Sequence, residues 1–84
     1  IFVYIIECSD KSFYTGITWN LQKRIFEHNN GLSMSTKSKI PVKLVYWEKF
    51  PDRITAAKRE KEIKGWSRLK KVNLIKKFTL SQQS

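Results

Sequence analysis

The chain has 84 residues, of which 40% are hydrophobic and 13% aromatic, and 17 Lys and Arg against 7 Asp and Glu give it a net charge of +10. This length and composition exclude several large domains and a disordered chain, and the single cysteine excludes an internal disulfide and fits a reducing compartment. No apolar run approaches the roughly 20 residues that span a bilayer, so we expect a cytoplasmic protein without a membrane partner.

The first third of the chain predicts two strands and a helix. The apolar run Ile1–Ile6 reads as a strand, Ser9–Ser12 has turn chemistry, and Phe13–Ile17 returns as a second strand rich in β-branched and aromatic residues. Asn20 can then cap a helix that ends at Asn29–Gly31, where glycine tolerates a left-handed conformation.

Four side chains with chemical potential lie on these predicted elements. Arg24 and His28 are four residues apart and therefore share one face of the helix. If the hairpin loop holds two or four residues, Tyr4 and Tyr14 fall on opposite faces of the sheet. They share one face only in an odd register, in which the loop holds an odd number of residues, such as three at Asp10–Ser12, or the strand contains a bulge. We therefore predict an odd register.

A polar loop and a third strand are expected next. The hydroxyls and lysines of Ser33–Lys39 either close over a phosphate or form a simple exposed connector. Val42–Phe50 is predicted to form a third strand, and its nearly continuous apolar run Leu44–Trp47 indicates that both faces are partly covered. Pro51 ends this strand, and Asp52 or Thr55 can cap the helix that follows.

The second helix, about Arg53–Lys64, places an acidic residue on its predicted apolar side. That side is expected to consist of Ile54, Ala56, Ala57 and Ile63. Glu60 falls within this stripe, whereas Glu62 points the opposite way, and an inward carboxylate needs a partner. It forms either a buried ion pair, with Arg24 or a lysine of the sheet, or a metal ligand or general base in a cleft; the second interpretation is favoured.

A third helix is predicted from Arg68 to Phe78, with Ser67 as its N-cap. Its apolar side is expected to consist of Leu69, Val72, Ile75 and Phe78. Trp66 either stacks on a nucleobase or, as favoured, closes the core between the two helices. The order β-β-α-β-α-α predicts a small α/β sandwich, with a three-stranded, mostly antiparallel sheet flanked by helices. We expect one domain over residues 1–80 and a short tail over 81–84.

Positive charge is concentrated at the C-terminal end, where residues 51–84 hold ten basic and three acidic residues. Nucleic acid is the favoured partner, because each neutralised phosphate releases condensed counterions. The alternative is a solvated helical surface that keeps the protein soluble. The basic residues expected to contact nucleic acid are Lys23, Lys37, Lys39, Lys64, Arg68, Lys70 and Lys71.

The candidate residues are sufficient for phosphodiester hydrolysis. A carboxylate such as Glu60 suits Mg²⁺, which prefers few protein carboxylates and keeps several waters. Arg24 can hold two phosphate oxygens and offset the charge that grows in the transition state. A tyrosine or His28 can take the proton from the attacking water.

These residues also resemble a known family, the GIY-YIG nuclease domain. Phe2-Val3-Tyr4 matches the first strand motif of that family at its tyrosine, and Tyr14-Thr15-Gly16 matches the second at its tyrosine and glycine. Arg24 and His28 match the helix pair of the family, and Glu60 matches its metal-binding glutamate. The resemblance covers residues 2–78 and is particularly close to small stand-alone bacterial members.

The resemblance implies an endonuclease that hydrolyses DNA, including branched or damaged DNA in repair or recombination, with one Mg²⁺ or Mn²⁺ ion on Glu60. Tyr4 would activate the attacking water, and Gly16 would be structural. The supporting residues would be Tyr14, Arg24 and His28. Relatives often carry an asparagine after the third helix, and Thr79 stands at that place here.

Two other functions remain open at this point. A non-catalytic module of the same fold would bind nucleic acid through its positive surface, and the departure at Thr79 favours it. A protein-interaction adaptor is the weaker alternative. Salt separates them, because counterion-driven binding weakens steeply as salt rises.

Overall fold

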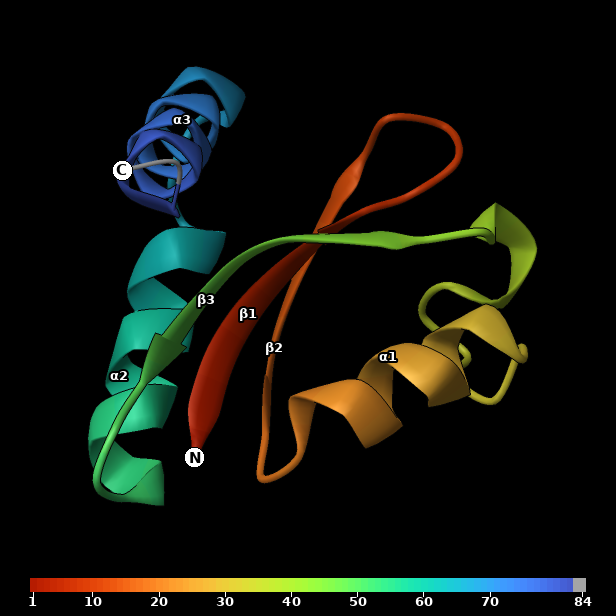
Figure 1. Ribbon diagram of the computed structural model, residues 1–84, viewed down its shortest axis with the longest axis horizontal. Helices are drawn as coiled ribbons and strands as arrows, with labels where there is room; N and C mark the ends of the chain where they lie inside the picture. The colour runs from red at the N-terminus through yellow and green to blue at the C-terminus, as the bar shows by residue number, and fades with distance from the viewer. Residues whose placement is uncertain (83–84) are drawn as a thin grey trace.

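The computed structural model describes residues 1–82, which contain three strands and three α-helices (Figure 1). In chain order they are β1 (Phe2–Glu7), β2 (Phe13–Thr18), α1 (Leu21–Asn29), the short 3₁₀ helix η1 (Lys37–Lys39), β3 (Lys43–Lys49), α2 (Arg53–Lys64) and α3 (Arg68–Gln82). The predicted order and the small α/β fold are confirmed. Within the described residues, no helix is long and apolar enough to cross a membrane.

The sheet has the strand order β2-β1-β3, and both strand pairs are antiparallel. Tyr4 lies opposite Gly16 and Ile6 opposite Tyr14, so the two tyrosines share a face and the predicted odd register is confirmed. The three-residue loop is Ser9–Lys11, one position earlier than expected, and Lys11 adopts a φ of 73° in it.

Helices cover both faces of the sheet, with α1 on one side and α2 and α3 on the other (Figure 1). The α2–α3 side holds an apolar core around Val3, Ile5 and Ile63, each with no exposed surface. The α1 side holds a second cluster around Tyr4 and Ile6. Alternate residues of β1 therefore build two different layers.

Each α-helix begins at a polar cap that the sequence predicts. The Asn20 side chain accepts a hydrogen bond from the Lys23 backbone N–H at 3.1 Å. Asp52 Oδ1 accepts one from the Thr55 N–H at 2.8 Å. The cap of α3 is Ser67, whose Oγ accepts from a backbone N–H of the first turn. These caps fix where each helix leaves the sheet.

The prediction that Ile54 and Leu69 belong to the apolar sides of their helices is wrong. Ile54 and Leu69 are 71% and 70% exposed. Each lies nine residues before a residue that packs in the core, Ile63 and Phe78 respectively. Nine residues at 3.6 per turn make two and a half turns, so each exposed residue faces the opposite way from its buried partner.

The C-terminal helix is longer than predicted. It continues to Gln82 instead of ending at Phe78, and so extends past residue 81, where a tail was expected to begin. Residues 83–84 of that expected tail lie outside the described residues. Trp66 packs against the apolar core, as the favoured interpretation predicted.

Candidate active site

Tyr4 is the centre of a polar cluster on the α1 side of the sheet. It lies in the middle strand, and only 1% of its surface is exposed. Its hydroxyl lies 2.9 Å from His28 Nε2, and Arg24 Nε donates a hydrogen bond to it at 3.3 Å. Burial raises the pKa of Tyr4, while the hydrogen bond from Arg24 lowers it, so the group is a neutral phenol near pH 7.

Gly16 makes room for the tyrosine ring. A Cβ atom at this position would lie 2.7 Å from Tyr4 Oη and 2.8 Å from Tyr4 Cζ, which is closer than real contacts allow. Gly16 is also the cross-strand partner of Tyr4, so the ring lies across the neighbouring strand where the side chain is missing. The glycine is therefore required by close packing of the site.

His28 is fully buried, and both of its ring nitrogens have partners. Nδ1 lies 2.7 Å from Thr36 Oγ1, and Nε2 faces Tyr4. Among the described residues, His28 Nε2 is the acceptor for the Tyr4 hydroxyl proton, so we assign that proton to this hydrogen bond. The ring proton is then assigned to Nδ1, which donates to Thr36 Oγ1. Burial lowers the pKa of His28, and the Arg24 charge adds to this effect, which favours the neutral ring.

Thr36 was not identified from the sequence. It lies in the polar segment for which the sequence left two alternatives, a loop that closes over a phosphate and an exposed connector, and only 1% of its surface is exposed. Nearby Ser33 is also buried, so the exposed-connector interpretation of this loop is wrong for both residues. A threonine among serines and lysines has no periodic signal, and its role emerges only when the loop folds back on α1.

Tyr14 lies beside the cluster and is half-buried. Its ring centroid is 5.3 Å from that of His28 and 6.3 Å from that of Tyr4. Of the two phenols, Tyr14 is therefore the one with access to solvent in this structure.

Glu27 is a second residue that the sequence did not indicate. Its carboxylate accepts a hydrogen bond from Arg24 Nη1 at 3.3 Å. Arg24 is thus held at two points, by Nε on Tyr4 and by Nη1 on Glu27. These contacts place the guanidinium over the buried phenol.

Glu60 lies on α2, which packs against β1 and β2. Its side chain is 22% exposed and pairs with Lys64 of the same helix at 3.2 Å, not with Arg24 or a lysine of the sheet. Burial is the main cause that raises the pKa of Tyr4, and the Glu60 charge raises it as well. Glu62 is 54% exposed and points away, as predicted.

The donor set at Glu60 is compatible with a magnesium-type ion. Within residues 1–82 there is no cluster of three or more His, Cys, Asp or Glu that would form an all-protein metal cage. A hard divalent ion of this kind commonly uses one or two carboxylates and completes its shell with water and phosphate oxygens. A single accessible carboxylate fits that requirement.

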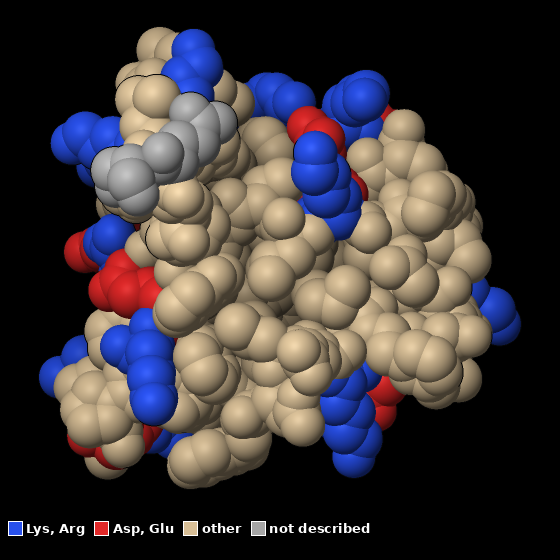
Figure 2. Space-filling model, in the orientation of Figure 1, with Lys and Arg blue, Asp and Glu red and all other residues tan. Residues whose placement is uncertain are grey.

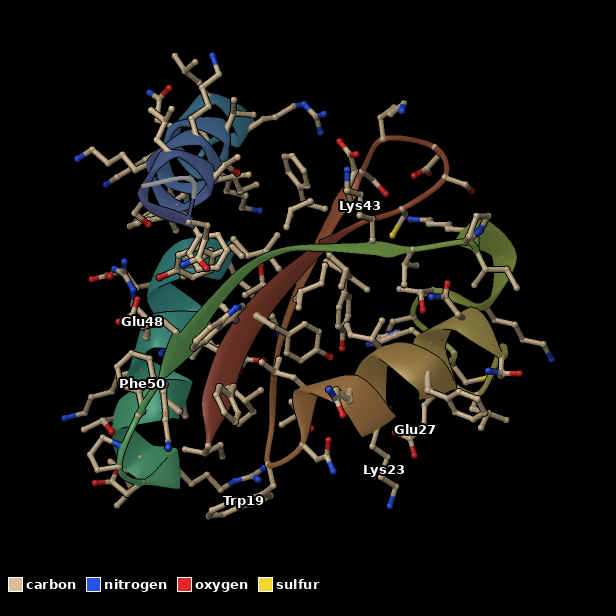
Figure 3. All side chains as sticks on the ribbon, in the orientation of Figure 1. Trp19, Lys23, Glu27, Lys43, Glu48 and Phe50 are labelled. Atoms are coloured by element: carbon tan, nitrogen blue, oxygen red, sulfur yellow. The ribbon has the colours of Figure 1, made fainter. Side chains whose placement is uncertain are left out.

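The basic residues expected to contact nucleic acid lie in three separate places. Figure 3 shows Lys23 on the side of α1 turned away from the sheet. Lys37 and Lys39 belong to η1. The remaining four are at the α2–α3 junction: Lys64, Arg68, Lys70 and Lys71. In Figure 2, basic side chains gather over α3 and around the rim of the visible face.

Thr79 does not join the polar cluster. It lies on α3, where its hydroxyl donates to the Ile75 carbonyl at 3.0 Å. Helix α3 packs against β3 on the side of the sheet opposite α1. The chemistry around Tyr4 is therefore built without this residue.

The fold holds a phenol between a guanidinium and an imidazole on one face of the sheet, and Glu60 lies on α2, which packs against β1 and β2. The chain belongs to the GIY-YIG catalytic domain family, whose sequence profile matches residues 1–73. This is a family of nucleases that generally depend on a divalent metal and act on nucleic acid. The predicted resemblance is confirmed.

Among its relatives, the chain is most usefully compared with small proteins of similar length. It is 49% identical to UPF0213 protein SSP2268 of Staphylococcus saprophyticus over 88% of this chain and 92% of that protein. It is 51% identical to a UPF0213 protein of Syntrophus aciditrophicus over 89% and 88%. The solution NMR structure of UPF0213 protein BH0048 from Bacillus halodurans matches with a TM-score of 0.59 and 39% identity, over 89% of this chain and 81% of that one.

Proposed function

We propose that this protein is a metal-dependent endonuclease that hydrolyses phosphodiester bonds in DNA. The observation that carries the proposal is the buried Tyr4 hydroxyl, hydrogen-bonded to His28 Nε2 at 2.9 Å and to Arg24 Nε at 3.3 Å. A phenol needed only for packing requires one hydrogen-bond partner, whereas this one has a proton acceptor on one side and a fixed positive charge on the other.

The proposed proton path starts at the water that attacks phosphorus. As the new O–P bond forms and the bond from phosphorus to the leaving oxygen breaks, the water gives a proton to Tyr4 Oη, and Tyr4 gives its own proton to His28 Nε2. The leaving oxygen takes up a proton from solvent water. Arg24 stabilises negative charge that develops on the phenol oxygen. Thr36, 2.7 Å from His28 Nδ1, keeps the ring in the tautomer that leaves Nε2 free to accept.

Arg24 has a second task at the phosphate. Its guanidinium can hold two phosphate oxygens in a bidentate contact. In the structure it covers the Tyr4 hydroxyl and pairs with Glu27. We therefore propose that substrate phosphate competes with Glu27 for Arg24, and that this movement opens the way for water to Tyr4.

Glu60 is the residue that would hold a divalent ion, Mg²⁺ or Mn²⁺. When bound, that ion would polarise the phosphate and stabilise the leaving oxygen. The ion would have to displace Lys64, whose ammonium lies 3.2 Å from the Glu60 carboxylate. Lys64 would then be free to contact the DNA backbone.

The finer features of the function rest on the charge and composition of the chain. A net charge of +10 supports a polyanionic substrate. We propose DNA with branches or damage, as in repair or recombination, as the biological substrate. The single cysteine fits a reducing compartment, so we propose the cytoplasm as the location.

A non-catalytic nucleic-acid-binding module is the second candidate. Two observations favour it: Tyr4 is only 1% exposed, and Glu60 is already paired with Lys64. Such a module would retain the fold and the positive surface without hydrolysing its ligand.

The test is cleavage of labelled duplex, flap and four-way-junction DNAs with Mg²⁺ or Mn²⁺. Glu60→Gln is expected to abolish cleavage without weakening DNA binding, because it removes the carboxylate that would hold the ion and releases Lys64. Glu62→Gln is the matched control, because it removes the same charge from the exposed side of the same helix. Tyr4→Phe is expected to lower the rate by about 10²- to 10⁴-fold, the usual contribution of a general base.

The other outcomes are equally informative. If Tyr14→Phe abolishes cleavage and Tyr4→Phe does not, the half-buried phenol activates the water. If the wild-type protein binds every DNA tightly in a salt-sensitive manner and cleaves none, the protein is the binding module. If the protein instead binds its partner through an interface whose affinity does not fall as salt rises, that interface is mainly apolar and indicates the protein-interaction adaptor.

A further inference from the structure

A groove lies at the α2–α3 junction, away from the polar cluster. It has a volume of about 180 Å³ and is lined by Trp66, Lys70, Asn73, Leu74 and Lys77. Trp66 packs with the apolar core on the α2–α3 side of the sheet, whereas Tyr4 belongs to the α1 side. The groove is therefore a separate surface from the site proposed for hydrolysis.

The side chains of the groove combine an aromatic ring with positive charge. Lys70 Nζ lies 4.4 Å from the centre of the Trp66 ring, and the Arg59 guanidinium lies 5.0 Å from it. Lys70 and Lys77 are seven residues apart on α3, so they share one face of the helix, two turns apart. Asn73 lies between them and offers both a donor and an acceptor.

The charge in the groove is also uncompensated. Among the described residues, Lys70 and Lys77 form no ion pair, whereas Lys64 pairs with Glu60 and Arg59 pairs with Glu48 and Glu62. A cation that lies over an aromatic ring without an acidic partner is free to move to an anion that arrives from solvent.

We propose that this groove binds an unpaired strand of nucleic acid. A base stacks on Trp66, Lys70 moves from the ring to a neighbouring phosphate, Lys77 contacts a second phosphate, and Asn73 hydrogen-bonds the edge of the base. Stacking on an aromatic side chain beside a positively charged groove is how proteins bind single strands without strong sequence preference.

The choice of an unpaired strand follows from what the groove offers. The faces of bases are accessible only where the strand is unpaired, and a duplex presents mainly its phosphates. A duplex-binding surface would need the lysines but not the indole. An acidic peptide would likewise use the lysines alone, and it serves as a competitor in the test below.

Binding of the unpaired strand to the groove does not depend on catalysis. A preference for cleaving DNA with an unpaired arm would rest on the proposed function. The experiment therefore measures binding without divalent metal, by fluorescence anisotropy, with labelled oligo(dT) and a hairpin duplex. The groove variant is Lys70→Ala/Lys77→Ala. The control is Lys58→Ala/Lys76→Ala, which removes the same charge from positions outside the groove.

We expect the groove variant to bind oligo(dT) at least tenfold more weakly than the control variant, with both variants binding the duplex equally. The salt dependence for the single strand should fall by about 0.7 in log–log slope for each phosphate contact removed. Trp66→Leu should weaken oligo(dT) binding without changing the salt slope, provided that its circular dichroism spectrum shows a folded protein.

Equal weakening by the groove and control variants would overturn the proposal, because it would mean that net charge alone drives binding. Competition by polyglutamate as effective as that by oligo(dT) at equal charge would also overturn it. This measurement contains no divalent metal and no cleavage step, so its result does not depend on whether Glu60 supports hydrolysis. Failure of the groove and failure of the proposed hydrolysis therefore give different results.

Discussion

The two faces of β1 differ in chemistry although they are buried to the same extent. Val3 and Ile5 point toward α2 and α3, and Tyr4 and Ile6 point toward α1; none of the four is more than 1% exposed. The first pair meets an apolar core. Tyr4, on the second face, meets the imidazole of His28, which is itself fully buried.

The difference shows how a small domain divides stability from function. The α2–α3 side supplies hydrophobic burial, which is favourable without directional requirements. The α1 side buries polar groups, which is tolerable because each hydroxyl and ring nitrogen of Tyr4 and His28 has a partner. The site face is therefore sensitive to single atoms, whereas the apolar face should tolerate polar-to-apolar replacement.

The largest effect is expected from Gly16→Ala on the site face. The added methyl group would lie 2.7 Å from Tyr4 Oη, so the ring must shift and lose its contacts with His28 and Arg24. We expect a loss of about 1–3 kcal/mol of unfolding free energy from overpacking. DNA cleavage should fall by about 10²- to 10⁴-fold, because the proton acceptor is displaced.

Gly65→Ala is the matched control for that substitution. Gly65 has a φ of −82°, and the nearest atom to a new Cβ would be the Glu62 carbonyl at 3.6 Å, an ordinary contact. Urea denaturation and cleavage assays on both variants separate the two positions. Equal effects at Gly16 and Gly65 would show that the close approach to Tyr4 is not what makes Gly16 necessary.

A smaller effect on the free energy of unfolding, which differs between the two faces, is expected from a pair of threonine-to-valine substitutions. Thr36→Val removes the partner of the buried His28 Nδ1–H and should destabilise the protein by about 1–3 kcal/mol. Thr15 is buried on the apolar side, and its Oγ1 has no hydrogen-bond partner among the described residues. Thr15→Val should therefore be neutral or stabilising by up to about 1 kcal/mol.

The readout for this pair is the free energy of unfolding in urea. Thr36→Ser is the conservative control, because it keeps the hydroxyl and should retain most of the stability and the cleavage rate. A Thr36→Val protein as stable and as active as the wild type would mean that the Thr36 hydroxyl does not hold the His28 tautomer.

Local patterns predicted the parts of the fold that depend on neighbours in the sequence. Asn20, Asp52 and Ser67 were identified as caps because short polar side chains precede periodic segments. The odd register followed from requiring Tyr4 and Tyr14 to share a face, and the pairing of the strands confirms it.

The parts that the sequence did not reveal depend on tertiary closure. Thr36 reaches His28 only because the loop after α1 folds back, and no local pattern encodes that path. In the sequence Glu27 is one of several charged residues on a polar helix. It adjoins the site only because its partner Arg24 is hydrogen-bonded to Tyr4. An ion pair of Glu60 with Arg24 or a lysine of the sheet was one of two alternatives from the sequence; the observed partner is Lys64, one turn along the same helix, where an ion pair needs no long-range contact.

The smallest effect is the pH dependence that His28 should impose. Burial, with the Arg24 charge adding to it, lowers the pKa of His28 from its usual value near 6.5. Between 6.5 and the lower folded value, the unfolded chain binds a proton that the folded chain does not. Acid therefore favours unfolding, and stability should fall by at most about 1.4 kcal/mol per pH unit as pH decreases through this window.

This dependence can be assigned to one residue, because the chain contains a single histidine. Hydrogen bonds from Ser12 and Thr55 lower the pKa values of Asp10 and Asp52 below their usual value. NMR titration of the His28 ring protons in the folded protein should give a midpoint below 6.5. A midpoint at or above 6.5 would contradict the lowered pKa, and a midpoint above the pH of the cleavage assay would mean that the ring is charged at the start of the reaction, so that Nε2 could not accept the Tyr4 proton. The two faces of β1 would then differ in polarity but not in proton transfer.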